Sequence, residues 1–282
     1  MYQGREMYAE EIPYKIEDAD DLPKEEKRGN WGIAFGLQAV DGLRPSDYMR
    51  GLAEENIAGG KTHAQVSDEV KKYYSDGKGS IAEREADIAS ERIKYILSEK
   101  GFSFRTSALK EIHRAIFTGL LNPEMPGFSE FITHEITEGR FRHYPVTKQE
   151  RVFGGETVDY APPGEIEAAL EHDFEREESY VFAGLTADEK AHHIMGFISG
   201  IWQIHPFGDG NTRACVTFGV KYMRSLGFAV DNEPFEKHSQ FFRDALVLDN
   251  YRKSRNPEYL RLFTENLLLG GNNDLSFEIP AI

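Results

Sequence analysis

Apolar positions recur at helical spacing along most of the chain. In residues 81–101, Ile81, Ile88, Ile93 and Leu97 follow this spacing, and Gly101 is a helix-ending signal. Residues 107–121, 164–182 and 186–205 show similar patterns, and the last of these presents one continuous apolar face. No internal repeat of fixed period is present. The pattern predicts a mainly α-helical protein.

Polar residues that start helices support this prediction. Ser46 follows a proline and precedes a helical pattern, so we expect it to be an N-cap. Thr62 with Gln65, and Thr186 with Glu189, have the spacing of a capping box. These positions predict where three helices begin.

The periodicity changes once, in "ERVFGGETVDYAPPGE". Two short strand-like runs flank Gly154 and Gly155, and Pro162 and Pro163 end the second run. This arrangement predicts a β-hairpin within an otherwise helical chain.

Composition narrows the range of partners. The 282 residues include 33 basic and 48 acidic residues, for a net charge of −15, and show no dense basic cluster. Such a chain repels nucleic-acid backbones and anionic lipids, so we expect neither as a partner. The single cysteine excludes an intrachain disulfide, and no amino-terminal apolar stretch predicts a leader or membrane span, so we expect a cytoplasmic protein. Residues 1–29 are polar and predict a flexible arm.

The stretch "HPFGDGNTR" at 205–213 lies between two apolar helical patterns. Pro206 disfavours helical geometry at His205, so the preceding helix should end there. A new pattern begins at Asn211 and continues through Val216 and Val220. The stretch is therefore predicted to be a loop between two core helices.

The residues of this loop suit phosphate chemistry. Unpaired amides at the start of a helix attract anions, and Gly210 allows a phosphate to approach closely. Asp209 is a hard oxygen ligand suited to Mg²⁺, Arg213 is a cationic clamp, and His205 is a base that titrates near neutral pH. The alternative is a glycine-rich connection in which His205 merely caps a carbonyl. Six compatible residue types in nine positions favour a phosphoryl-group transfer site.

The loop resembles the Fic family motif, H-x-F-x-[DE]-G-N-G-R-x-x-R. Residues 83–93, the predicted hairpin and "FFRDALVLDNY" extend the resemblance over roughly 81–270. It implies an all-helical Fic domain at 81–282 with a short hairpin flap. Residues 30–80 look like the small helical antitoxins that accompany some Fic enzymes, which implies a regulator fused to its enzyme.

The resemblance also implies an activity, namely transfer of AMP from Mg-ATP to a Ser, Thr or Tyr hydroxyl of a target protein. His205 is then the base, Asp209 the magnesium ligand, and Phe207 the residue that anchors the loop. The sequence is compatible with self-modification and with a homo-oligomer. The implied nucleotide-binding residues are Gly208, Gly210, Asn211, Thr212 and Arg213. The flap residues that would align a target segment by strand addition are Val152, Phe153, Gly154, Gly155, Glu156, Thr157 and Val158.

Two positions depart from the motif. Thr212 stands where the family usually has glycine and where the related Doc toxins have lysine and transfer a phosphoryl group. Val216 stands where a second arginine usually holds the terminal phosphate. No clean match to the inhibitory [ST]-x-x-x-E-[GN] motif is present. AMP transfer is favoured, and phosphoryl transfer, other nucleotidyl transfer and a catalytically weak ATP-binding regulator remain as alternatives.

Other notable residues have simpler expected roles. His113 lies in an apolar pattern and is expected to be a core histidine, and Cys215 a buried thiol. His192 and His193 point about 100° apart on a helix, which disfavours a shared metal site. Glu83 and Glu85 are expected to be solvated acids at a helix start.

Overall fold

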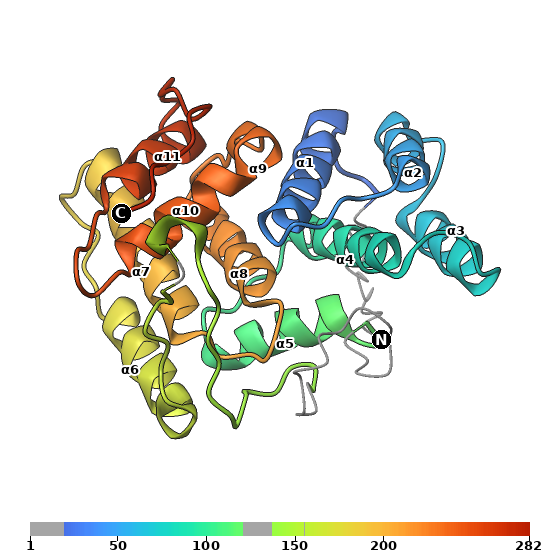
Figure 1. Cartoon of the computed structure of the whole chain (residues 1–282). Coiled ribbons are helices and arrows are strands. Elements are labelled where there is room, and N and C mark those ends of the chain that lie inside the picture. The colour runs from blue at the N-terminus through green and yellow to red at the C-terminus, as the bar shows by residue number, and fades with distance from the viewer. Residues whose placement is uncertain (1–19, 121–136, 155) are drawn as a thin grey trace, which may run out of the picture.

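The computed structural model describes residues 20–120, 137–154 and 156–282, and the regular structure in these ranges is entirely helical (Figure 1). The mainly helical fold is therefore confirmed. The α-helices are α1 (Lys24–Val40), α2 (Asp47–Ala58), α3 (His63–Ser75), α4 (Ile81–Ser98), α5 (Thr106–Phe117), α6 (Ile166–Glu178), α7 (Ala187–Ile204), α8 (Asn211–Ser225), α9 (Glu233–Lys237), α10 (Ser239–Asp249) and α11 (Glu258–Leu268). Two short 3₁₀ turns, η1 (Arg151–Phe153) and η2 (Pro163–Glu165), complete the described elements.

The predicted helix starts are confirmed. The Ser46 side chain accepts a hydrogen bond from the amide of Met49 at the start of α2. Thr62 and Thr186 form complete capping boxes at α3 and α7. Residues 1–29 were expected to form a flexible arm, and residues 1–19 of it lie outside the described residues. Helix α1 already begins at Lys24, so residues 24–29 are helical.

Helix α8 lies at the centre of the fold. All of its residues from Asn211 to Met223 are buried, and it packs against α5, α7, α4 and α1. A Cβ at Gly219 would lie 2.6 Å from the Ile198 side chain of α7, so glycine permits the close approach of these two helices. The two helices that flank the predicted loop therefore pack closely against each other.

Helix α1 joins the amino-terminal helices to the carboxyl-terminal ones. It packs on α4 and also on α9 and α10, and Figure 1 shows it standing between α2 and α9. At Gly36 a Cβ would lie 2.3 Å from the Phe235 carbonyl oxygen of α9. One apolar core extends from Trp31 to Ile279. The carboxyl end of α1 is thereby held beside α8 and α10.

The predicted β-hairpin is absent from the described residues, so this expectation is wrong. The chain does fold back, because the Glu150 amide donates to the Glu156 carbonyl at 3.1 Å. Residues Arg151–Phe153 instead curl into η1, and Gly154 takes the left-handed φ of 59°. Burial of Val152 and Phe153 in the core favours this compact turn over a regular two-stranded ladder.

None of the helices in the described ranges has the length and apolar character that crossing a membrane requires.

Candidate active site

The loop between α7 and α8 has an unusual backbone at both ends. His205, which directly follows α7, is the only described non-glycine residue with a positive φ, at 53°. Gly210, the N-cap of α8, has a φ of 69°, and a Cβ there would lie 2.3 Å from the Phe117 ring. Both the conformation and the space therefore require glycine at 210. The predicted helix end at His205 and the start of the next helix at Asn211 are confirmed.

Asn211 and Phe207 hold the loop in shape. The Phe207 amide donates to Asn211 Oδ1 at 2.8 Å, and Asn211 Nδ2 donates to the Phe207 carbonyl at 2.9 Å. The Phe207 ring is fully buried and stacks on His113 at 3.8 Å between ring centroids. The Asn211 side chain thus braces the loop, and only its backbone amide faces the start of α8. Helix α8 has no side-chain cap, which is the arrangement that favours an anion at its N-terminus.

His113 supports the loop from α5, as expected of a core histidine. The Gly139 amide donates to its Nδ1 at 2.9 Å, so Nδ1 is an acceptor and Nε2 carries the proton. Nε2 then donates to the Asp209 carbonyl at 3.0 Å. Burial lowers the pKa of His113 from 6.5 to about 4. The neutral imidazole is therefore part of the folded loop.

This histidine makes the stability of the fold depend on pH. Since the unfolded chain binds the proton more tightly than the folded protein, the free energy of unfolding should fall as the pH drops from 6.5 toward 4. The steepest slope for one such site is roughly 1.4 kcal/mol per pH unit. Urea unfolding of the wild type and His113→Gln at several pH values checks this: the variant should lose part of the slope. His172→Gln, at an exposed histidine of α6, is the control and should keep it.

His205 is half-buried beside the flap segment, which is defined as residues 151–160. Its ring stacks on Tyr160 with centroids 4.0 Å apart. Burial, followed by the positive charges of Arg243, Arg142 and Lys148, lowers the pKa of His205 well below 6.5. The imidazole is therefore neutral at pH 7 and able to accept a proton.

Arg142, which no sequence motif indicated, fixes the backbone around His205. Its buried guanidinium donates to the carbonyl oxygens of His205 at 2.7 Å, Tyr144 at 2.8 Å and Ala161 at 2.5 Å. Its own amide donates to the Pro206 carbonyl at 2.8 Å. One side chain thus ties the loop at 205–213 to the residue that directly follows the flap segment.

Arg213 is buried among acidic side chains at the start of α8. Its Nη1 lies 2.7 Å from Glu85 Oε1 of α4, and its Nε lies 3.0 Å from Asp41 Oδ2, directly after α1. The guanidinium also lies over the Phe117 ring at 4.6 Å. The expectation of a solvated Glu85 is therefore wrong, because the charge of Arg213 draws it into the site.

A second arginine, also missed in the sequence analysis, lies on α10. Arg243 is 5% exposed, and its Nη2 contacts Glu150 Oε1 at 2.5 Å. Its Nη1 lies 3.3 Å from Thr212 Oγ1, which also accepts a hydrogen bond from Trp202 Nε1 at 3.0 Å. The buried Thr212 side chain therefore contacts a cation at the start of α8.

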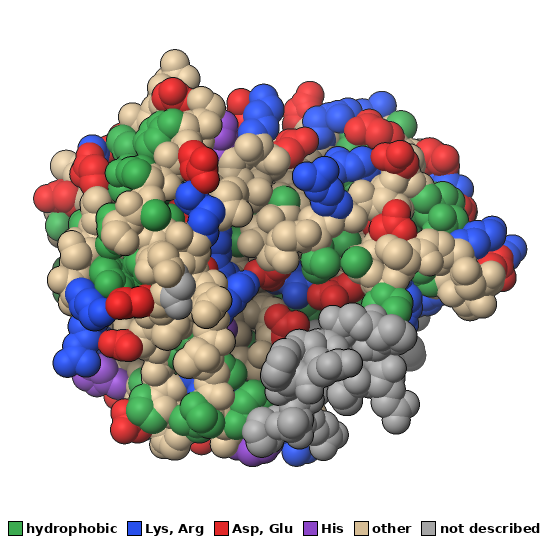
Figure 2. Space-filling view, viewed as in Figure 1, with side chains coloured by type: hydrophobic (Ala, Val, Ile, Leu, Met, Phe, Trp, Pro, Cys, Tyr) green, Lys and Arg blue, Asp and Glu red, His purple; other side chains and the backbone are tan. Residues whose placement is uncertain are grey.

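Asp209 and Gly208 form the outer part of the loop. Gly208 is half-buried, and the Asp209 side chain is 44% exposed. Asp209 Oδ1 accepts a hydrogen bond from the Gly210 amide at 2.6 Å and lies 4.0 Å from Arg213 Nη2. Carboxylate oxygens are ligands that Mg²⁺ prefers. Figure 2 shows acidic and basic side chains gathered in a recess at the centre of the face of the protein that it presents.

The flap segment is fixed by neighbouring elements, and its residues divide into two groups. Val152, Phe153 and Val158 are buried, whereas Gly154 and Glu156 are exposed and Thr157 is half-buried. Gly155 lies outside the described residues. Glu156 accepts hydrogen bonds from Tyr251 Oη at 2.8 Å and Lys253 Nζ at 2.6 Å. A cleft of about 780 Å³ lies beside the exposed residues of the flap segment. It is lined by Thr147, Gln149, Glu156, Thr157, Asp159, Tyr251, Arg252 and Lys253.

Two residues near the loop belong to the core. Cys215 is fully buried, which confirms the expected buried thiol, and burial raises its pKa. Val216 is 3% exposed. An apolar core residue thus occupies the position at which the Fic motif has its second arginine.

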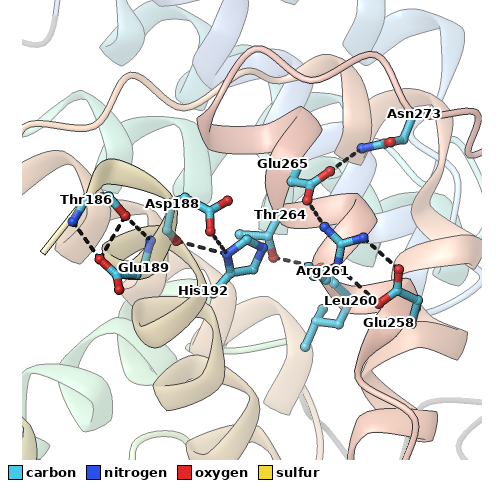
Figure 3. A network of polar contacts seen from close by, with 10 residues as sticks. All are labelled: Thr186, Asp188, Glu189, His192, Glu258, Leu260, Arg261, Thr264, Glu265 and Asn273. Carbon is cyan, nitrogen blue, oxygen red and sulfur yellow. Dashed lines mark hydrogen bonds and ion pairs between the residues drawn. The ribbon is translucent and has the colours of Figure 1, made fainter.

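His192 lies in a separate polar network between α7 and α11 (Figure 3). Its Nδ1 contacts the Asp188 carbonyl at 2.9 Å, and the spacing of Asp188, His192 and Glu265 is compatible with a metal ion. Glu265, however, already pairs with Arg261 and accepts from Asn273 Nδ2 at 2.8 Å. His193 instead contacts Glu177 at 2.7 Å, so the adjacent histidines face different partners as expected.

Comparison with known proteins identifies a match over the region that contains the loop. Residues 103–223 match the model of the Fic/DOC family. No match was found among curated proteins. The similar solved structures include three that each have a TM-score of 0.49.

The first similar structure is BepC of Bartonella tribocorum, a VirB-translocated effector with bound AMPPNP, which is 17% identical over 67% of this chain and 86% of that chain. The second is the N-terminal Fic domain of a putative cell filamentation protein from Bartonella quintana, 19% identical over 67% and 82%. The third is a Fic domain-containing signaling protein from Bacteroides thetaiotaomicron, 17% identical over 88% and 87%.

Proposed function

The chain belongs to the Fic/DOC family, and from this membership and the loop geometry we propose that it transfers AMP from Mg-ATP to a Ser, Thr or Tyr hydroxyl of a target protein. The observation that carries the proposal is the placement of neutral His205 beside the uncapped start of α8. A proton acceptor and an anion-binding helix end thus lie on one short loop, braced from both sides.

In the proposed reaction, the hydroxyl oxygen of the target forms a bond to the α-phosphorus of ATP. The bond from this phosphorus to the bridging oxygen breaks, and pyrophosphate leaves. His205 takes the hydroxyl proton. Bound phosphates would offset the positive charges that lower the pKa of His205, so the histidine becomes a stronger base once ATP is in place. The amides at the start of α8, together with Arg213, would bind the phosphates.

Asp209 fits the role of magnesium ligand, because its partly exposed carboxylate borders the same helix end. Mg²⁺ would supply charge neutralisation on the phosphates of ATP. The exposed edge of the flap segment, at Gly154, Glu156 and Thr157, is where a target segment would align.

Alanine at Asp209 should weaken ATP binding in the presence of Mg²⁺ and reduce the gain in affinity that Mg²⁺ provides. Isothermal titration of the wild type and Asp209→Ala, each with Mg²⁺ and with EDTA, measures this. Asp159→Ala, at an exposed carboxylate of the flap segment, is the control and should retain the metal dependence. Equal ATP affinity of the wild type with and without Mg²⁺ would refute the role.

A catalytically weak ATP-binding regulator is the second candidate function. It is favoured by the pairing of Arg213 with Asp41 and Glu85, since both carboxylates compete with ATP for the guanidinium. Intact-mass measurement of the protein and of lysate proteins after incubation with Mg-ATP separates the candidates. An added AMP moiety supports AMP transfer, and an added phosphate supports phosphoryl transfer. Tight ATP binding without any addition supports the regulator.

A further inference from the structure

We propose that Arg243, from α10, is a second phosphate-binding residue of this site and contacts the β- or γ-phosphate of ATP. The inference rests on the proposed function and deepens it, because it assigns a specificity-determining residue to a helix outside the loop. Three observations carry it: a shared carboxylate, a tether to Thr212, and proximity to His205.

The shared carboxylate is Asp41, which lies between two guanidinium groups. Its Oδ2 is 3.0 Å from Arg213 Nε, and its Oδ1 is 3.9 Å from Arg243 Nη1. Two cations therefore converge on a single anionic group. A phosphate that displaced the Asp41 carboxylate would contact both arginines at once, as a polyphosphate ligand requires.

Thr212 ties Arg243 to the start of α8. The distance from Arg243 Nη1 to Thr212 Oγ1 is 3.3 Å, and the same oxygen accepts a hydrogen bond from Trp202 Nε1. Glycine at 212 would offer no side-chain oxygen for this contact. Arg243 can thus supply a second cation at the start of α8, while Val216 remains in the core. The two departures from the motif are explained together.

Arg243 also acts electrostatically on the catalytic loop. Among the charged residues, it contributes most to lowering the pKa of His205. It lies over the Trp202 ring at 5.3 Å and is held by Glu150, which directly precedes the flap segment. This places its positive charge close to where the transferred group and the base must meet.

The test compares the binding of ATP, ADP and AMP to purified full-length variants by isothermal titration. Arg243→Gln combined with Glu150→Gln removes both ends of the buried ion pair, so no buried charge is left unpaired. We expect this variant to lose about tenfold or more in ATP affinity, the loss typical of one charge-assisted hydrogen bond, and to retain AMP affinity. Glu150→Gln alone keeps the arginine and should bind ATP at least as tightly as the wild type.

Arg243→Lys provides a second variant that keeps the charge, and it should fall between the wild type and the double variant in ATP affinity. Thermal unfolding of each variant establishes that it is folded. Equal losses for ATP and AMP would show a merely structural role and overturn the proposal, as would unchanged ATP affinity in the double variant. If the wild type binds ATP but transfers no AMP, only the proposed function fails. If the wild type binds none of the three nucleotides, both proposals fail.

Discussion

Replacement of His205 by alanine is expected to lower AMP transfer about 10²–10⁴-fold, because it removes the proposed acceptor of the hydroxyl proton. ATP binding should persist, since the amides of α8 and the two arginines stay in place. Transfer rates with labelled ATP and a separate ATP titration measure the two properties independently.

A matched control for this variant is His172→Ala, which removes an exposed histidine from α6. It should transfer AMP at the wild-type rate. The mechanism is contradicted if His205→Ala retains wild-type activity. It is also contradicted if the loss of transfer is fully explained by a loss of ATP binding.

Arg142→Met should produce the largest loss of stability. The arginine side chain donates to the carbonyl oxygens of His205, Tyr144 and Ala161, all in or beside the core. Each buried carbonyl left without a donor costs roughly 1–3 kcal/mol, so we expect a loss of about 3 kcal/mol or more in the free energy of unfolding. Urea unfolding at pH 7 measures it.

The control for this substitution is Arg140→Met, which changes an exposed arginine two positions earlier. Its unfolding free energy should remain within about 0.5 kcal/mol of the wild type. Arg142→Lys keeps the charge but cannot reach several carbonyls at once, so it should be intermediate. Wild-type stability of Arg142→Met would show that the carbonyls find other donors.

The helical part of the fold could be predicted because its signals are local. The capping boxes at Thr62 and Thr186 and the proline after His205 act within one helical turn, and periodicity of 3.6 residues marks the buried faces. The loop between α7 and α8 could be predicted for the same reason, since the signals that end one helix and start the next are close in sequence. The roles of His205, Asp209 and Arg213 in this loop stay predictions.

The hairpin prediction was wrong because strand formation depends on surroundings that the sequence does not display. Val152 and Phe153 are adjacent apolar residues, and both are buried in the core. The Phe153 ring stacks on Tyr251 with ring centroids 4.0 Å apart. This tertiary contact, with the ion pairs of Arg151 to Asp244 and Glu278, determines the local backbone.

The residues that contact the start of α8 from elsewhere in the fold were missed because they approach from distant helices. Periodicity predicts that a helix has a buried face, but it does not show which helix this face meets. Arg243 reaches Thr212 from α10, and Asp41 reaches Arg213 from the end of α1. Buried charged residues in otherwise apolar helical patterns, such as Arg243, were the one available signal.

The most direct test of the proposed activity uses ATP labelled at either the α- or the γ-phosphate, incubated with Mg²⁺, cell lysate, and wild-type protein or His205→Ala. AMP transfer predicts that the α-label alone becomes attached to protein, and only with the wild type. Attachment of the γ-label, or equal attachment of the α-label with both proteins, would contradict the account.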